Sequence, residues 1–513
     1  MRFGLWAPVL AGGLASVLAA GDAEACGGCF IPPFDGTVGQ TVVTGHRMAL
    51  AISPTQTVLW DQIQYSGDPA EFAWVLPVKP GAYIEAATDA WFETLEAATG
   101  TAVLQPQVSC HDSFDFGGCG TDYSGGTVRA VSEDDSGGSF GGGGPAVDVI
   151  HRGTVGPYET VTLSTMTPGA LNAWLTGHTY NVDPSTQPII DAYVAEGFDF
   201  IAIRLLPDKG VREMKPVRVV APGASDTLPL RMVAIGTGPT VAVTLFVISE
   251  GRMAAGNFPN AEVPVDLMAW DFEANRSNYA ELRAQTLKEA EGGSAFITTY
   301  AKPGPLLSPT TAPNGFFGSV SYGFSQDGTP LDTIAEAYLN QSIQNSEVST
   351  VENPMDPGSC VGLFSGFEGG LSQSPAVVAN PCPMGQPLND PACGSVGGGE
   401  LDARMLACGA ATDLAAALIG MHPRDVWLTR LEADLPQAAL KADMTVTAAA
   451  SQASVENFIR ARIAVNADTL CGSFVGPAVW PSSGGRGMLW SLSLGGLALA
   501  AALARRVTRS RLT

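Results

Sequence analysis

Cys26 and Cys29 form the sharpest motif in the chain that could do chemistry. Their Cys-x-x-Cys spacing allows reversible disulfide closure, as in thiol–disulfide redox proteins. A redox site of the thioredoxin type, however, lies between a strand and a helix, and no strand is expected before Cys26. We therefore favour a structural bridge or a flexible end, and keep the redox function as the alternative. A zinc site would need a second Cys or His pair at similar spacing, and the sequence contains none.

All nine cysteines lie in the expected mature chain, and outside the cytoplasm their usual state is the disulfide. Cys110 and Cys119 bracket a loop rich in Gly and Asp, and we expect them to pair. Four more lie in or beside a Pro/Gly-rich stretch and predict two bridges of open connectivity: Cys360, Cys382, Cys393 and Cys408. Cys26, Cys29 and Cys471 are then left, so one thiol is formally unpaired.

Ser139 lies in a pattern that formally matches the nucleophile elbow of hydrolases, Gly137-Gly138-Ser139-Phe140-Gly141. That chemistry needs a strand before the serine and a helix after it. Here acidic residues precede the motif and glycines follow it, so we interpret it as a chance match. The sequence also lacks a phosphate-binding Gly loop and a dinucleotide fingerprint after a strand. We therefore expect no catalytic residue and no cofactor.

The five histidines are scattered, and none has a second histidine at i+3 or i+4, so no helix-borne zinc motif is present: His46, His111, His151, His178 and His422. His111 stands beside Cys110 in a loop with three aspartates that offer oxygens for calcium: Asp112, Asp115 and Asp122. Their spacing is not that of a regular calcium loop. A solvated acidic loop is our interpretation, and no metal site is predicted.

Both ends of the chain predict export and membrane attachment. Met1 and Arg2 precede an apolar run over 3–20, and Ala23-Glu24-Ala25 supplies a signal-peptidase site, so the mature chain begins at Cys26. Lipidation of Cys26 is an alternative, although only Ala25 fits the usual lipidation box. At the other end, residues 488–504 are uncharged and precede Arg505-Arg506. Their helix would span about 25 Å, slightly less than the ~30 Å hydrocarbon core.

The arginines after this apolar segment place the tail in the cytoplasm and the main body outside it. The Gly-Gly pair before the apolar segment, the segment itself and the Arg-rich end also resemble bacterial tripartite sorting signals. In proteins with such signals the helix is removed and the protein moves to the cell surface. The net charge of −23 and a pI near 4.5 argue against nucleic acid as a partner. A membrane is the one partner we expect, and a protein or small-molecule partner is unknown.

Apolar periodicity predicts an α+β fold with largely antiparallel β-sheets and several short helices, plus one C-terminal transmembrane helix. Met48, Leu50 and Ile52 are expected to face one side of a strand. We predict further strands at 58–60, 72–76, 159–163, 198–206, 216–220, 228–235, 240–249, 426–431 and 444–448. Helices are predicted after Thr88 to Gly100, after Thr167-Pro168, over 188–196, after Ser277, after Thr329-Pro330 and over 400–421.

These features divide the chain into consecutive segments. We expect a signal peptide over 1–25, a strand-rich part over 26–108, a Gly/Cys-rich loop insert over 109–150, a central α+β part over 151–345, a Cys-rich insert over 346–399, a C-terminal α+β part over 400–471, a linker over 472–487, the transmembrane helix over 488–504 and a basic cytoplasmic tail over 505–513.

Four segments in order resemble a bacterial family of exported proteins, domain of unknown function 2330: 25–30 (ACGGCF), 63–78 (IQYSGDPAEFAWVLPV), 193–200 (YVAEGFDF) and 428–431 (LTRL). The resemblance covers most of the mature chain apart from the two inserts. It implies an extracytoplasmic bacterial envelope protein with a signal peptide and often a C-terminal anchor; the family has no assigned activity or catalytic residues to carry over to this chain. We therefore expect an uncharacterised, membrane-anchored envelope protein whose non-catalytic ectodomain binds a ligand or partner. The alternatives are a periplasmic thiol–disulfide redox protein and, third, a hydrolase with an unrecognised site.

Overall fold

The structure is a computed structural model. It describes residues 29–30, 42–66, 73–106, 147–178, 186–206, 209, 213–235, 237–290, 293–306, 322–324, 328, 330–347, 412–421 and 426–463. The chain divides into two compact units, one of 1–106 with 120–464 and one of 107–119 with 465–513. The second unit lies outside the described residues, so the fold is that of the first.

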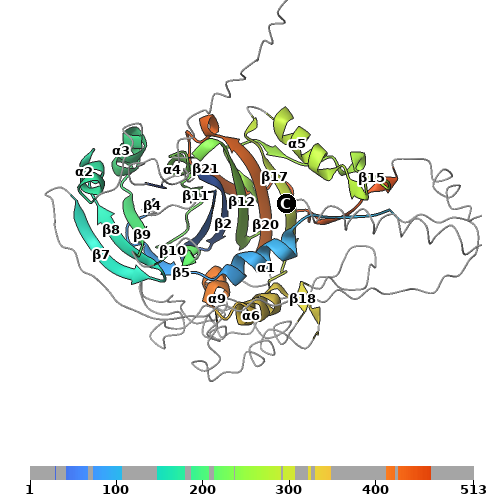
Figure 1. The fold of residues 1–513 in the computed structure, drawn as a ribbon, viewed down its shortest axis with the longest axis horizontal. Coiled ribbons are helices and arrows are strands. Elements are labelled where there is room, and N and C mark those ends of the chain that lie inside the picture. The colour runs from blue at the N-terminus through green and yellow to red at the C-terminus, as the bar shows by residue number, and fades with distance from the viewer. Residues whose placement is uncertain are drawn as a thin grey trace, which may run out of the picture. The chain divides into compact units, whose positions relative to one another are not determined.

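The centre of the fold is an eight-stranded sheet whose strands come from distant parts of the chain (Figure 1). Their order is β14-β17-β20-β12-β2-β3-β10-β5. The pairing is antiparallel except between β12 and β2 and between β14 and β17. The strand bounds are Val42–Ile52 (β2), Gln56–Ser66 (β3), Tyr83–Ala86 (β5), Val217–Pro222 (β10), Thr237–Glu250 (β12), Asn260–Ala261 (β14), Phe296–Pro303 (β17) and Val426–Pro436 (β20).

A fully antiparallel five-stranded sheet packs against one face of the large sheet, in the order β1-β4-β9-β8-β7. Its strands are Cys29–Phe30 (β1), Ala73–Val78 (β4), Asp148–Val155 (β7), Tyr158–Ser164 (β8) and Asp199–Leu205 (β9). Between the two sheets, apolar side chains of β4 and β9, such as Leu76 and Ile203, meet others of β3 and β10, such as Ile63 and Val219. We call this the inner face of each sheet.

Short strands complete the β structure. Three of them form a sheet that covers the rest of the large sheet's inner face: Thr227–Leu228 (β11), Met444–Ala448 (β21) and Met253–Ala255 (β13). Another three-stranded sheet contains Arg276–Ser277 (β16), Ala269–Asp271 (β15) and Arg462–Ile463 (β23). Two pairs remain, Gly323–Phe324 (β18) with Pro330–Leu331 (β19), and Phe458–Arg460 (β22) with Ala102–Leu104 (β6).

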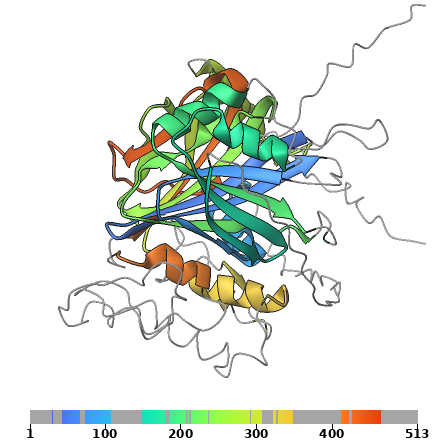
Figure 2. The same cartoon turned by 90° about the vertical axis from the view of Figure 1, so that its left-hand side faces the viewer.

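Helices cover the outer faces of both sheets. On the large sheet, α1 (Asp89–Thr99), α6 (Ile334–Gln344) and α9 (Thr412–Leu418) pack over Trp60 and Phe246, and Figure 2 shows α6 (yellow) and α9 (orange) side by side below the strands. On the five-stranded sheet lie α2 (Ala170–Gly177) and α3 (Gln187–Ala195). The remaining helices are α4 (Leu230–Val233), α5 (Tyr279–Glu289) and the 3₁₀ turns Val265–Leu267 (η3) and Gln437–Ala439 (η8).

The predicted fold class is confirmed for the described residues, which form an α+β structure with mostly antiparallel sheets. The common side of Met48, Leu50 and Ile52 is confirmed, and strand β21 has the predicted bounds. Within the described ranges, no helix is long and apolar enough to cross a membrane. The predicted signal peptide over 1–25 and the predicted transmembrane helix over 488–504 both lie outside those ranges.

Helix α1 begins after Thr88 and ends before Gly100, as predicted, but Thr88 does not cap it with its side chain. The carboxylate of Glu347 takes that role, because its two oxygens accept from the backbone N–H groups of Asp89 (2.9 Å) and Ala90 (3.1 Å). Lys215 then joins the same carboxylate to that of Asp89. The hydroxyl of Thr88 is thereby free to bind elsewhere.

Two other predictions differ from the structure, and one long strand is not predicted. The strand predicted over 228–235 is wrong, since β11 ends at Leu228 and the short helix α4 follows Pro229. The helix predicted after Thr329-Pro330 begins later, because Leu331 belongs to β19 and Thr333 with Glu336 forms the capping box of α6. Strand β17 has no counterpart among the predicted strands. Of the helix predicted over 400–421, the structure describes 412–421, with α9 in it.

Candidate functional site

His46 and Asp61 form a buried pair on the inner face of the large sheet. The Nδ1 atom of His46 lies 3.1 Å and 3.2 Å from the two carboxylate oxygens of Asp61. The two side chains are only 1% and 5% exposed. The second ring nitrogen, Nε2, is also buried and has no hydrogen-bond partner among the described residues. Buried polar atoms are nearly always hydrogen-bonded, so an orphaned imidazole nitrogen marks this pair as a candidate site.

A bulge in β2 places Val43 on the same inner face as His46. Between Val43 and Gly45, β2 advances by two residues while β3 advances by one, so Thr44 is an extra residue. Side chains alternate along a strand, and Val43 and His46 would otherwise point to opposite faces. With the bulge, both lie on the inner face. A Cβ atom at Gly45 would stand 3.0 Å from the carbonyl oxygen of Ala242 on β12, so glycine suits this close approach.

The hairpin register brings Asp61 to the same place. Strands β2 and β3 pair so that His46 lies opposite Ile63 and Met48 lies opposite Asp61. Asp61 is therefore a diagonal neighbour of His46 on one face of the sheet, within reach of a side-chain contact. The chain reverses at Ser53, whose backbone N–H donates to the carbonyl of Gln56, and this tight turn fixes the register.

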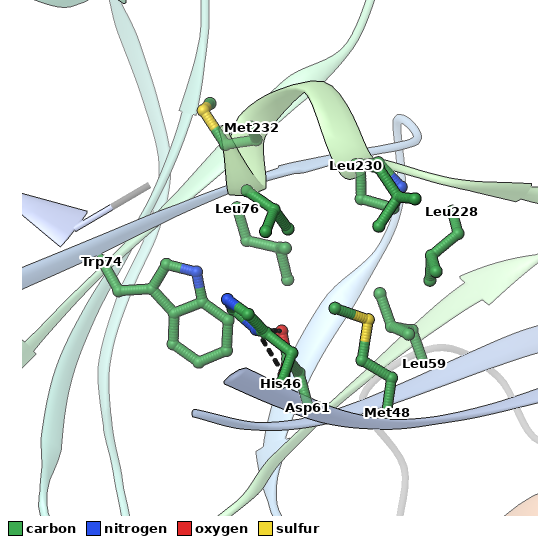
Figure 3. A pocket seen from close by; sticks show the side chains of 11 residues that line it. His46, Met48, Leu59, Asp61, Trp74, Leu76, Leu228, Leu230 and Met232 are labelled. Carbon is green, nitrogen blue, oxygen red and sulfur yellow. Dashed lines mark hydrogen bonds and ion pairs between the residues drawn. The ribbon is translucent and has the colours of Figure 1, made fainter. Parts of the chain in front are cut away.

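The pair lines a small cavity between the eight-stranded sheet and the five-stranded sheet (Figure 3). Its volume is about 10 Å³, the space that one water molecule or one hydroxyl group needs. In Figure 3 one ring nitrogen of His46 faces Asp61, and the other points away from it toward Trp74 and Leu76 of β4. The remaining lining is apolar and comes from β2, β3, β11 and the segment through α4: Met48, Leu59, Leu228, Pro229, Leu230, Met232 and Val233.

A second pocket adjoins the cavity and shares Leu59, Leu76 and Pro229 with it. Its volume is about 50 Å³. Apolar side chains from both sheets line most of it, among them Leu50, Val78, Phe198, Val219 and Ala221. Lys79 stands at this pocket with its ammonium group 4.1 Å from the ring centre of Phe198. We call the two spaces together the inter-sheet cleft, and name them the inner cavity and the outer pocket.

A second buried carboxylate, Asp413 of α9, lies on the opposite face of the large sheet and is fully hydrogen-bonded. Its Oδ1 accepts from Trp60 Nε1 at 2.8 Å and from Arg218 Nη1 at 2.7 Å. Its Oδ2 accepts from the backbone N–H of Thr88 at 3.0 Å, from the Thr88 hydroxyl at 2.7 Å and from the Tyr338 hydroxyl at 3.1 Å. A carboxylate with five donors has no capacity left for a ligand.

The charges around Asp413 stabilise the fold rather than prepare chemistry. Burial opposes the charge of Arg218, but the carboxylates of Asp413 and Glu85 outweigh it and raise the pKa of the guanidinium. Burial, and then the negative charge of Asp413, raise the pKa of Tyr338 well above its ordinary value. Both groups therefore keep one protonation state at any physiological pH, and α9 is held to the sheet by a fixed network.

Most residues singled out in the sequence lie outside the described part of the chain. Cys26, Cys110, Cys119, Cys360, Cys382, Cys393, Cys408 and Cys471 do so, as do Ser139, His111, His422 and the three aspartates Asp112, Asp115 and Asp122. The backbone of Cys29 is described and pairs with that of Trp74 at the edge of the five-stranded sheet. His151 lies exposed on β7, and His178 stacks on Trp174 at the end of α2. In the described ranges no three His, Cys, Asp or Glu residues could hold a metal ion.

The His46–Asp61 pair does not follow from the histidine spacing, because a helical zinc motif needs a second histidine nearby and the partner is an aspartate fifteen residues away. A signal is nevertheless present in the sequence. Ser53-Pro54 marks a turn, and counting outward from it along two strands places residue 46 near residues 61 and 63. Asp61 also follows apolar residues at the start of its strand. A carboxylate there is expected to be buried, and a buried carboxylate needs a partner.

Comparison with known proteins gives a family and no function. No curated protein and no solved structure matches the chain. The family model described as an uncharacterized protein conserved in bacteria, DUF2330, matches residues 22–310. This range includes His46, Asp61 and every residue that lines the inter-sheet cleft, whereas Asp413 and the segment 428–431 lie beyond it. The match covers more than half of the sequence, and the chain therefore belongs to this bacterial family of unknown function.

Proposed function

We propose that this chain is an exported, membrane-anchored envelope protein that binds a small, mainly apolar ligand in its inter-sheet cleft. The observation that carries the binding function is the cleft itself, a mainly apolar space with the His46–Asp61 pair at its inner end and a few polar side chains, Thr57, Lys79, Ser225 and Thr227, around the outer pocket. Ligand sites in proteins are commonly built in this way, from apolar walls and a few placed polar groups.

The lining favours binding over turnover. None of the eleven side chains around the inner cavity carries a hydroxyl, thiol or amine group. His46 and Asp61 could act as a general base, but the cavity offers them no protein nucleophile to activate. A ligand held there would be recognised by shape, apolar contact and one ring nitrogen.

Export and anchoring are supported by the two ends of the sequence. The apolar run before Ala25 and the uncharged segment before Arg505 are the features of a signal peptide and of a membrane helix. Mass spectrometry of the chain isolated from bacteria should find Cys26 as the first residue, and the protein should stay with the membrane after carbonate washing. Recovery of the chain from the cytosol with Met1 attached would refute this part of the proposal.

Ligand binding can be tested on the full-length chain in lipid nanodiscs, with empty nanodiscs as the blank for probe partitioning. The probes are 1-hexanol and its isomer 1-methoxypentane, and the readout is the ¹³C-methyl signals of Met48 and Met232, which line the inner cavity. Both signals are assigned from the Met48→Leu and Met232→Leu spectra. We expect saturable shifts with at least one probe. Absence of any shift up to the solubility of both probes would refute the binding function.

A variant that fills the outer pocket locates the site. Ala221 lines that pocket, so Ala221→Phe should weaken probe binding by about tenfold or more because its ring takes the space of the aliphatic chain. Ala274→Phe, in an exposed turn, is the matched control and should bind as the wild type does. Equal binding by the two variants would place the probe elsewhere on the protein.

A further inference from the structure

The two ring nitrogens of His46 have opposite surroundings. Nδ1 lies within hydrogen-bond distance of both oxygens of Asp61, whereas Nε2 is buried without a partner in the described part of the chain. An ionised carboxylate only accepts hydrogen bonds, so Nδ1 carries the proton of the neutral ring. Asp61 thereby fixes the tautomer, and Nε2 presents a lone pair to the inner cavity.

We infer that Nε2 of His46 accepts a hydrogen bond from the hydroxyl group of a neutral aliphatic alcohol, whose carbon chain lies in the outer pocket. This inference rests on the proposed binding function and specifies its ligand class. The inner cavity has the volume of one hydroxyl group, about 10 Å³, and the adjoining pocket of about 50 Å³ has mainly apolar walls.

Other small ligands fit this arrangement less well. A carboxylate has no proton to donate to Nε2 and would bring a second negative charge close to the buried Asp61. A water molecule could donate, but a buried water makes about three hydrogen bonds, and apart from Asp61 and the indole N–H of Trp74 the rest of the cavity lining is apolar. An alcohol donates its one proton and replaces such a poorly held water with a group whose chain also buries apolar surface.

The two isomeric probes separate the ligand class from the binding function. They have the same atoms and nearly the same length, but only 1-hexanol has a proton to donate. At pH 8 the wild-type chain should bind 1-hexanol about tenfold more tightly than 1-methoxypentane, the value of one buried hydrogen bond. If both bind equally, the inference on the alcohol falls and the proposed function stands. If neither binds, both fall.

Two variants test the tautomer. In Asp61→Asn the amide group can donate to Nδ1, which moves the ring proton to Nε2 and turns that nitrogen into a donor. Both isomers can accept from it, so the preference for the alcohol should shrink to about twofold or less. The double variant His46→Leu with Asp61→Leu removes the pair without leaving a buried charge. It should bind both isomers equally, and a retained tenfold preference in either variant would overturn the role of His46.

Discussion

Two buried carboxylates on opposite faces of one sheet have opposite hydrogen-bonding states. Trp60 and Asp61 are neighbours on β3, and their side chains point to different sides. On the outer face Trp60 donates to Asp413, which accepts five hydrogen bonds in all. On the inner face Asp61 binds one ring nitrogen of His46, and the other nitrogen is left without a partner in the described residues.

The difference indicates what each face is for. A saturated carboxylate serves folding, because its five donors come from four elements that must all meet at the carboxylate of α9: β3, β10, α6 and the start of α1, where Thr88 supplies two of the five. A pair with one unused nitrogen beside a cavity stabilises the fold less and offers a bond to something else. Stability and binding are therefore expected to respond separately to mutation on the two faces.

The largest expected effect comes from Asp413→Asn. The substitution removes a buried negative charge and leaves the guanidinium of Arg218, which is 5% exposed, with Glu85 as its remaining carboxylate partner in the described structure. The free energy of unfolding should fall by about 3–5 kcal/mol, measured by denaturant unfolding of the full-length chain. Asp266→Asn, at an exposed position, is the control and should change it by less than about 0.5 kcal/mol. A similarly small change in Asp413→Asn would show that the network is not a stability element.

A smaller loss is expected from Thr88→Val, which keeps the shape of the side chain and deletes one donor to Asp413. The hydroxyl of Thr88 lies 2.7 Å from the carboxylate, and hydrogen bonds to charged groups contribute about 1.5–3 kcal/mol. The unfolding free energy should fall by that amount, whereas Thr240→Val on the exposed end of β12 should leave it unchanged. Equal values for the two variants would assign the stabilisation to the other donors.

Tyr338→Phe should reduce stability by about 1.5 kcal/mol at neutral pH and change its dependence on alkaline pH. Because burial and Asp413 raise the pKa of Tyr338, the unfolded chain loses this proton near pH 10 while the folded chain keeps it. The unfolding free energy of the wild type should therefore fall as pH rises above about 10. That of the variant should fall less steeply, and the two slopes should differ by about 1.4 kcal/mol per pH unit. Parallel alkaline curves for the two proteins would contradict the raised pKa.

No loss of stability is expected from the double variant His46→Leu with Asp61→Leu. Replacement of a buried polar pair by apolar side chains of similar size is neutral or stabilising, by about 1–4 kcal/mol. The single variant His46→Leu should instead lose stability, since it leaves Asp61 buried with no imidazole. If the double variant lowered the free energy of unfolding as much as Asp413→Asn does, both faces would serve folding, and the proposed difference between them would be wrong.

Elements with local signals can be predicted from the sequence, whereas contacts that depend on register follow only once the pairing of the strands is assumed. Helix α1 and strand β21 have the predicted bounds because flanking residues and alternation lie within the segments themselves. The predicted strand over 228–235 is wrong because Pro229 and the packing of α4 override an apolar run that has no clear period. Alternation with Met48 places His46 on the inner face, but its contact with Asp61 depends on the pairing of β2 with β3, so in the sequence His46 looks like one of several scattered histidines.

The strand order of the large sheet has a consequence for how the chain is made. Strand β20 lies between β12 and β17, yet it is synthesised more than a hundred residues after β17. Until Val426–Pro436 has left the ribosome, β12 and β17 each present a free edge of backbone N–H and C=O groups. Unpaired apolar edges of this kind are templates for aggregation. The nascent protein therefore needs protection between the synthesis of β17 and that of β20, the last long strand of the described chain, which closes the sheet.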